Sequence, residues 1–548
     1  MREGKRGFML AQTLMDTLNA DQLQFNDSAS CKRWIALLPL TNVESSQLAL
    51  TWQVSRVRQA VLAPLELLRV LEALREPAAY VQYELARKYA GKPQPLDAAE
   101  AACWARVLRL WQEFIAAYTL CRDAHARGDP GVKNHGALIV MRCLRYTAGA
   151  MFEHYRAYRQ VPGELWKQLH QHYAFAEQGG FARTLVVDAF SQQEAASSCA
   201  TAYRQALLVQ LANPFALSGQ QLEVLARWSA NWAGLVNLTS EPLPPSASPA
   251  LVVDLAGNSG PVFATGLEPR AGLRYLDREP LGRTLRQVIA LLKQGQTPAQ
   301  LDLGANARQP GCGNLLMLLY IQWCRAGTDR GEQRAPTAEN AQVCLGMHAA
   351  HFYISGRSFR SPGAGLSRQQ EHDLQLFGHI SERTERALAS NENSAAESWQ
   401  LLNQSNSGFM CMLREPDAQL RIGHYQLVAV RRGSSKSFYL GLVQWLRIEE
   451  NNELLVGIRL FSGIARAVAV RPDNFNAPSA IKDFERALWL PEMATPTTPA
   501  TLILPSGWYQ AGRCVELHGD RKQVVTLVNL LEKGSDFERC TFTFDQNL

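Results

Sequence analysis

The sequence has no apolar run long enough to cross a membrane. Its densest apolar segment, Leu315 to Trp323, is shorter than the roughly 18 to 20 residues that a spanning helix needs. The N-terminal residues MREGKRGFMLAQTLMDTL include basic side chains but lack the continuous apolar stretch and small-residue cleavage site of a signal peptide. These absences predict a cytoplasmic protein without a membrane span.

Cysteine pairs and excess charge are also missing. The 11 cysteines are odd in number, scattered and nowhere spaced as C-x-x-C, so we expect neither a disulfide framework nor a structural zinc site. The net charge is only +6 over 548 residues, far from that of a protein that coats nucleic acid. Hydrophobic residues make up 47% of the chain, which is enough to bury several cores and excludes disorder as the main state.

The first part of the chain has apolar residues at helical spacing. Thr41 and Glu44 are spaced as a capping box, and Pro64 interrupts the helical run that follows. Further helices are predicted near 97–126, 136–160, 164–177, 180–212 and 219–237. The Pro- and Ser-rich stretch 240–250 predicts a linker at a domain edge. After it we expect a strand at 251–255 and helices near 281–295, 313–326 and 337–355.

Beyond about residue 395 the pattern changes from helical to alternating. Strands are predicted at 397–402, 408–413, 424–431, 437–448 and 454–462, then at 500–505, 512–518, 523–531 and 538–544. The predicted fold class is therefore α+β, with a large mainly α-helical N-terminal region, an antiparallel β-barrel and a second small β unit. The expected domains are 1–240 (helical), 241–374 (mixed, mainly helical), 375–475 (barrel) and 476–548 (C-terminal β unit).

One motif stands out between two of the predicted strands. Asn403, Ser405 and Gly408 fit the pattern (D/N)-x-S-x-x-G, directly before the strand Phe409 to Leu413. The pattern and the order of strands around it resemble the PilZ domain, the small bacterial β-barrel that binds cyclic di-GMP, over about residues 375–470. In that family the D/N-x-S-x-x-G turn contacts a guanine, and the glycine lets the turn approach the ligand closely.

The same family has an R-x-x-x-R segment before its first strand, whose arginines hold the guanines and phosphates. The resemblance assigns this role to Arg383 and Arg386, which are spaced R-x-x-R, one residue short of the family pattern. Arg357 and Arg360 have the same short spacing farther upstream. Planar guanidinium groups stack on bases and bind phosphate, which suits this ligand. The implied ligand is cyclic di-GMP, and no other cofactor is expected.

Charge in the β region favours an anionic ligand. From residue 414 to 471 there are nine basic and five acidic residues, an excess that would attract a bisphosphate and would equally attract RNA or DNA. The alternative interpretation is the solvated exterior of a barrel.

Other candidate sites are weaker. His348 and His351 could share a metal, but no third ligand completes the set, so packed histidines and no metal are expected. His170 and His172 are two residues apart on a predicted helix and are expected at the surface. The glycine-rich segment 304–314 lacks the Lys and Ser/Thr of a phosphate loop. We therefore expect a protein that is not an enzyme.

The leading hypothesis is a cytoplasmic cyclic di-GMP effector or adaptor in signalling, whose helical region couples ligand binding to an unidentified protein partner. The first alternative is a structural or interaction protein whose degenerate PilZ-like barrel binds no nucleotide. The second alternative is a barrel that binds nucleic acid. The small net charge of the chain makes nucleic acid an unlikely partner.

Overall fold

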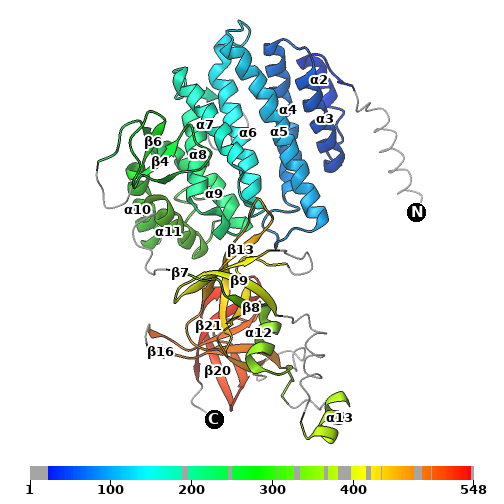
Figure 1. Ribbon diagram of the computed structural model, residues 1–548, viewed down its shortest axis with the longest axis vertical. Helices are drawn as coiled ribbons and strands as arrows, with labels where there is room; N and C mark the ends of the chain where they lie inside the picture. The colour runs from blue at the N-terminus through cyan, green and yellow to red at the C-terminus, as the bar shows by residue number, and fades with distance from the viewer. Residues whose placement is uncertain are drawn as a thin grey trace, which may run out of the picture. The chain divides into compact units, whose positions relative to one another are not determined.

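The computed structural model divides the chain into two compact units (Figure 1). It describes residues 22–187, 196–244, 250–304, 307–325, 334–362, 368–379, 396–414, 421–433, 435–473, 484–494 and 497–544. Unit 1 comprises Met1–Lys92 and Leu96–Arg330, and unit 2 comprises Pro93–Pro95 and Gly331–Leu548. Helices dominate the N-terminal part and strands the C-terminal part, which confirms the α+β class. Among the described residues, no helix is both long and apolar enough to span a bilayer.

Unit 1 is built from helices that follow one another along the chain and pack as neighbours, drawn in blue to green in Figure 1. They are α2 (Ser28–Ile35), α3 (Val43–Gln59), α4 (Pro64–Ala86), α5 (Ala98–Ala126), α6 (Gly136–Arg156), α7 (Gly163–Gln178), α8 (Cys199–Leu211) and α9 (Gly219–Trp232). Asp97 caps α5 in a capping box with Glu100. Pro64 starts α4, at a position where its missing N–H removes no helical hydrogen bond.

The start of α3 differs from the prediction. The expected capping box of Thr41 and Glu44 is wrong, because Asn42 caps the helix by accepting a hydrogen bond from the Ser45 N–H at 3.2 Å. The Glu44 carboxylate instead forms an ion pair with Lys88. The helix therefore starts one residue later than expected, because Asn42 and not Thr41 accepts the hydrogen bond from the backbone of the first turn.

The helix expected over 180–212 is also shorter than predicted. A two-stranded hairpin of β1 (Val186–Val187) and β2 (Ala196–Ser197) precedes it. The helix itself, α8, begins only at Cys199, where the Ser198 hydroxyl accepts from a backbone N–H of the first turn.

A small sheet and two helices complete unit 1. The strands lie in the order β3 (Asn237–Thr239), β6 (Leu273–Asp277), β4 (Leu251–Asp254) and β5 (Val262–Phe263). The helices are α10 (Glu279–Lys293) and α11 (Gly311–Cys324), which confirm two predicted helices. Because β3 and β4 belong to one sheet, the Pro- and Ser-rich stretch joins two strands within unit 1.

Unit 2 contains two β-barrels, of which the first is called the middle barrel here. Its ring runs β8 (Asn340–Leu345), β9 (Glu397–Gln404), β10 (Gly408–Leu413), β13 (Leu454–Leu460), β12 (Tyr439–Ile448) and β11 (Leu427–Arg432), and β11 pairs again with β8. Neighbouring strands are antiparallel. The short β7 (Ala335–Pro336) pairs with β9 beyond the end of β8. The five strands predicted between 397 and 462 are confirmed.

The first strand of this ring lies inside a predicted helix. The expected helix over 337–355 is wrong for residues 340–345, because β8 pairs with β9 on one side and β11 on the other. Only α12 (Gly346–Ser355) is helical there, and α13 (Arg368–Phe377) follows it. The expected domain boundary at residue 375 therefore divides strands that share one ring.

The second ring, the C-terminal barrel, is closed. Its order is β14 (Arg466–Pro472), β15 (Glu485–Leu490), β18 (Thr501–Pro505), β21 (Phe537–Phe544), β20 (Lys522–Lys533) and β19 (Cys514–His518). A hairpin of β16 (Met493–Ala494) and β17 (Thr497–Thr498) accompanies it. Leu427 and Phe461 of the middle barrel share a buried cluster with Leu488 and Phe537 of the C-terminal barrel. The predicted C-terminal β unit is thus a barrel in its own right that shares a core with its neighbour.

Candidate ligand-binding site

The Asn403-x-Ser405-x-x-Gly408 motif forms the turn between β9 and β10. Asn403 faces Met410 in the register of the two strands. The Ser405 N–H donates to the Gly408 carbonyl at 2.9 Å, and the Ser405 and Ser407 hydroxyls are 3.3 Å apart. Asn403 and Ser405 are half-buried and Ser407 is exposed. The turn therefore presents amide and hydroxyl groups at the surface of the barrel.

The side chain of Arg334 contacts this turn. Arg334 directly precedes β7, and β7 pairs with β9 so that Pro336 faces Asn403. The Arg334 guanidinium donates a hydrogen bond to the Asn403 Oδ1 at 3.4 Å, and Arg334 is exposed. A guanidinium can stack on a base and donate to phosphate or to the acceptor edge of guanine. The structure thus places a cation of suitable chemistry beside the motif.

Sequence reasoning missed Arg334. It ends the segment Arg330-Gly-Glu-Gln-Arg334, which has the full R-x-x-x-R spacing. The same spacing occurs at residues 2 and 6, 270 and 274, and 274 and 278, so spacing alone is a weak signal. The distinguishing signal is that two strands follow it, β7 and β8, which both pair with β9. The wrong helix prediction over 337–355 concealed these strands. Arg330 itself lies outside the described residues.

The arginines assigned from the sequence are not brought to the turn by any described contact. Arg383 and Arg386 lie outside the described residues, so their role stays a prediction. Arg357 and Arg360 follow directly after α12, and Arg357 is exposed.

Gly408 has a structural reason to be glycine. It pairs with Arg459 of β13, and a Cβ atom at Gly408 would lie 2.4 Å from the Ile458 carbonyl oxygen. No side chain fits at that distance from a neighbouring backbone. The last residue of the motif therefore fixes how closely β10, and with it the turn, approaches β13.

The positive charge of the β region is largely compensated. Of the nine basic residues between 414 and 471, five form ion pairs: Arg432 with Glu339, Arg447 with Glu449, Arg459 with Glu532, Arg466 with Asp520 and Arg471 with Glu516. Four of these five carboxylates lie outside residues 414–471. The charge count within that range therefore overestimated the local excess of positive charge. Such pairs break up a continuous basic surface of the kind that nucleic acids need.

Three of the four histidine candidates are packed side chains, whereas His348 is exposed, so its expected packing is wrong. The His351 Nε2 lies 3.2 Å from the Val468 carbonyl, and burial lowers the pKa of His351 to about 4. His170 and His172 are buried, so their expected surface position is wrong: α7 packs against α6 and α8, and His170 Nδ1 is 2.7 Å from the Tyr203 hydroxyl. In the described part of the chain, no three His, Cys, Asp or Glu side chains gather as a metal site.

Three family models match consecutive parts of the chain. The models are "Cyclic-di-GMP receptor FimW, N-terminal domain" at residues 29–245, "Cyclic-di-GMP receptor FimW, middle PilZ domain" at 250–377 and "FimW C-terminal beta-barrel domain" at 469–544. Residues 250–377 of the chain match a PilZ domain. Among curated proteins, the Cyclic-di-GMP receptor FimW of Pseudomonas aeruginosa is 24% identical over 556 aligned residues, which cover 93% of this chain and 90% of that protein.

The PilZ match and the resemblance seen in the sequence lie on adjoining stretches. The family model covers 250–377, which includes β8 and α12, whereas the sequence pattern was found over 375–470, which includes β9 to β13. Together the two stretches supply every strand of the middle ring. The PilZ resemblance is confirmed, and the structure shows that its strands begin upstream of the range first assigned to it.

Proposed function

We propose that this chain is a cytoplasmic cyclic di-GMP receptor, and that its middle barrel binds the dinucleotide beside the β9–β10 turn. The observation that carries the proposal is the contact between Arg334 and Asn403, because it joins the two motifs of the PilZ-domain family at one place on the barrel. The naming of the Pseudomonas aeruginosa relative as a cyclic di-GMP receptor supports the choice of ligand.

Each residue has a role that follows from its chemistry. Arg334, with Arg330, stacks on a guanine and pairs with phosphate. Asn403 and Ser405 offer donors and acceptors to the edge of a guanine. Gly408 has no side chain, which lets the ligand approach the backbone of the turn closely. These roles are those of a binding site, and the protein acts as an effector or adaptor, not as an enzyme.

Ligand binding would act on the segment that joins the two units along the chain. The division between the units falls at Arg330 and Gly331, inside the R-x-x-x-R segment. A ligand held by both arginines fixes the conformation of this segment. If the conformation differs between the bound and free states, the change passes the signal to unit 1 and its protein partner.

The nucleic-acid alternative is less well supported. The ion pairs described above neutralise five of the nine basic residues that suggested it. A specific pocket for a dinucleotide needs only the few cations near the turn, whereas general binding needs a long basic track.

Isothermal titration calorimetry with cyclic di-GMP tests the proposal on the full chain, with GTP, cyclic AMP and GMP as controls. We expect selective micromolar or tighter binding that is lost in Arg330→Ala with Arg334→Ala and in Asn403→Ala with Ser405→Ala. The matched double variant Arg383→Ala with Arg386→Ala removes the same charge and should bind within about twofold of wild type. If only the Arg383→Ala with Arg386→Ala variant loses binding, the ligand is held by Arg383 and Arg386, as the sequence first suggested. Absence of binding at about 100 µM ligand would leave the barrel as an interaction scaffold.

A further inference from the structure

Arg459 of β13 lies on the same face of the middle barrel as the β9–β10 turn. The strand register pairs Asn403 with Met410 and Met410 with Gly457, and paired residues of neighbouring strands share one face of a sheet. Side chains alternate along a strand, so Arg459, two residues after Gly457, lies on this face as well. Ile458, on the other face, is buried. Asn403 and Arg459 therefore both lie on the outside of the barrel.

One strand separates these two side chains. β10 lies between β9, which carries Asn403, and β13, which carries Arg459, so their backbones are about 10 Å apart at about 4.8 Å per strand pair. Gly408 pairs with Arg459 and has no side chain to stand between them. The turn also contacts the end of β13, because the Leu460 N–H donates to the Ser407 carbonyl at 2.8 Å. A ligand with two bases and two phosphates that lies over Gly408 is therefore within reach of the long Arg459 side chain.

Arg459 is held by a carboxylate of the C-terminal barrel. Its guanidinium pairs with Glu532 of β20 and donates to the Gln444 Oε1 at 3.3 Å. The side chain of Arg459 is 38% exposed and that of Glu532 is 22% exposed. An ion pair with this exposure is weak, because water competes for both charges. The pair is therefore able to open when a stronger anion is present.

A second arginine lies beside the same carboxylate. Arg539 of β21 pairs with Glu532 in the strand register. The guanidinium groups of Arg459 and Arg539 both lie over the Phe461 ring, 5.5 and 4.9 Å from its centroid. Burial lowers the pKa of Arg539, and the nearby charge of Glu532 opposes this effect. If Arg459 turns away, Glu532 therefore keeps a neighbouring cation.

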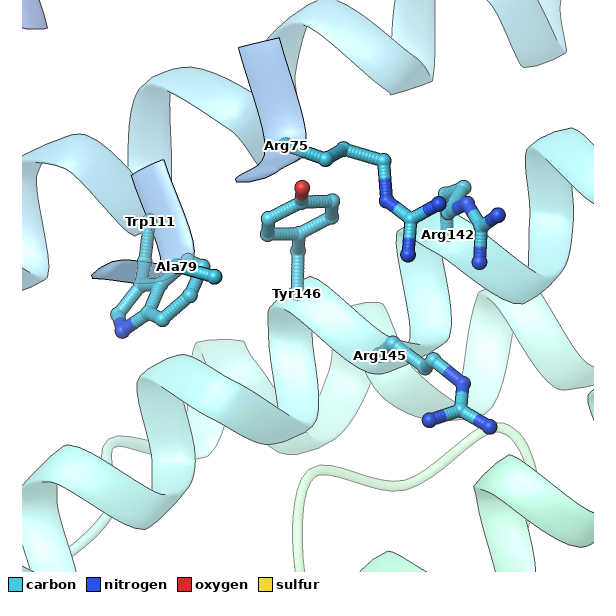
Figure 2. A pocket seen from close by; sticks show the side chains of 6 residues that line it. All are labelled: Arg75, Ala79, Trp111, Arg142, Arg145 and Tyr146. Carbon is cyan, nitrogen blue, oxygen red and sulfur yellow. The ribbon is translucent and has the colours of Figure 1, made fainter. Parts of the chain in front are cut away.

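Exposure distinguishes this group from a similar one in unit 1. There Arg75 of α4 and Arg142 of α6, which Figure 2 shows, share the carboxylate of Glu72 at 3.0 and 2.8 Å. The Arg142 side chain is only 3% exposed, so a ligand cannot reach it unless the helices separate. Arg459 is accessible from solvent, and of these two groups the one at Arg459 can exchange its anion.

We propose that Arg459 is a further nucleotide-binding residue, which exchanges Glu532 for a phosphate of cyclic di-GMP. The planar guanidinium forms two parallel hydrogen bonds with phosphate oxygens, and Glu532 turns to Arg539. Because this exchange removes a contact between the barrels, occupancy of the middle barrel acts on β20 of the C-terminal barrel. The inference rests on the proposed function, since it names a residue and a means of regulation of that same site.

A double-mutant cycle tests the exchange by calorimetric titration of the full chain with cyclic di-GMP. Arg459→Gln should weaken binding about tenfold, because the phosphate loses a charged partner. Glu532→Gln should tighten binding about threefold, because the weak competing ion pair is removed while the shape is kept. Such a gain of affinity cannot arise from misfolding. The double variant should bind as Arg459→Gln does, because Glu532 acts through Arg459.

Glu449→Gln is the matched control. Glu449 pairs with Arg447 of the same barrel, with side chains that are 19% and 35% exposed, close to the values for Glu532 and Arg459. Arg447 pairs with Leu455 in the strand register, four residues before Arg459 on β13. Since distant sites do not couple, Glu449→Gln should leave the affinity within about twofold of wild type.

The outcomes separate the exchange from the receptor function. Four results would overturn the exchange while wild-type binding upholds the receptor: no gain in Glu532→Gln, no loss in Arg459→Gln, a gain that persists in the double variant, or an equal gain in Glu449→Gln. If the wild-type chain binds no cyclic di-GMP, both proposals are wrong.

Discussion

The middle and C-terminal barrels have the same ring of six antiparallel strands, yet they differ in where they use glycine. In the middle barrel Gly408, Gly441 and Gly457 lie within strands, whereas the described strands of the C-terminal barrel contain no glycine. A Cβ at Gly441 would lie 2.5 Å from the Arg459 carbonyl oxygen, and one at Gly457 would collide with the Trp445 ring. All three glycines thus relieve crowding around β13.

This difference shows that the ring does not determine function by itself. The C-terminal barrel fills its interior with alternating apolar residues and closes without such contacts. The middle barrel presses β10 and β12 against β13, and the turn at the start of β10 carries Asn403 and Ser405. The two rings share an architecture, and the binding site that we propose lies where local sequence places polar groups on a firmly held turn.

The largest effect that would sharpen this comparison is expected at Gly408. Gly408→Ala forces the Ile458 carbonyl to move, because the new Cβ would be 2.4 Å from its oxygen, and should lower the free energy of unfolding by about 3 kcal/mol. Gly519→Ala in the C-terminal barrel brings a Cβ to 3.2 Å from a Val468 methyl group, which can rotate away, and should cost less than about 1 kcal/mol. Differential scanning calorimetry of the full chain measures both. Equal losses would mean that β13 is not specially crowded.

The next effect concerns a carboxylate that links the two barrels. The Asp536 Oδ1, in the turn between β20 and β21, accepts from the Leu427 N–H of the middle barrel at 2.9 Å. Burial raises the pKa of Asp536 to about 6, against the opposing effect of this hydrogen bond. Between the unfolded pKa near 3.9 and the folded value, the folded state holds more protons, so stability falls as pH rises through this window.

Asp536→Asn keeps the acceptor oxygen and removes the charge. The wild-type decrease from pH 4 to pH 7 that is due to Asp536, about 2 kcal/mol, should then disappear. Asp520→Asn in the C-terminal barrel, where the side chain is 93% exposed, should leave the pH dependence unchanged. Urea unfolding at several pH values gives the comparison, and an identical slope in wild type and Asp536→Asn would contradict it.

Much of this fold follows from local periodicity. The helices α5, α6 and α7 and the strands β9 to β13 lie where helical spacing and alternation predicted them. β8 was missed because Asn340–Leu345 runs directly into α12, and a short strand before a helix has no period of its own. Its pairing with β9 spans more than fifty residues of chain, and such nonlocal pairing is invisible to local patterns.

The site was predictable only in part, for the same reason. The spacing of Asn403, Ser405 and Gly408 identified the turn, since all three lie within six residues. Arg334 lies 69 residues from Asn403 in sequence, so the arginine could be assigned only by knowing which strand pairs with β9. His170 shows a related limit: a helix buried on two sides places polar residues in the core, where Tyr203 provides the hydrogen bond.

The smallest effect tests whether Arg334 acts through its shape or only through its charge. Arg334→Lys keeps the positive charge beside Asn403 but loses the planar group that stacks on a base and donates two parallel hydrogen bonds. We expect cyclic di-GMP to bind about tenfold more weakly, or about 1.4 kcal/mol, with an unchanged dependence on salt because the charge is kept. The matched variant Arg466→Lys, on the C-terminal barrel with a side chain that is 71% exposed, should bind as wild type does. Calorimetry at two salt concentrations decides the matter: equal affinity in Arg334→Lys and wild type would reduce the role of Arg334 to that of a cation.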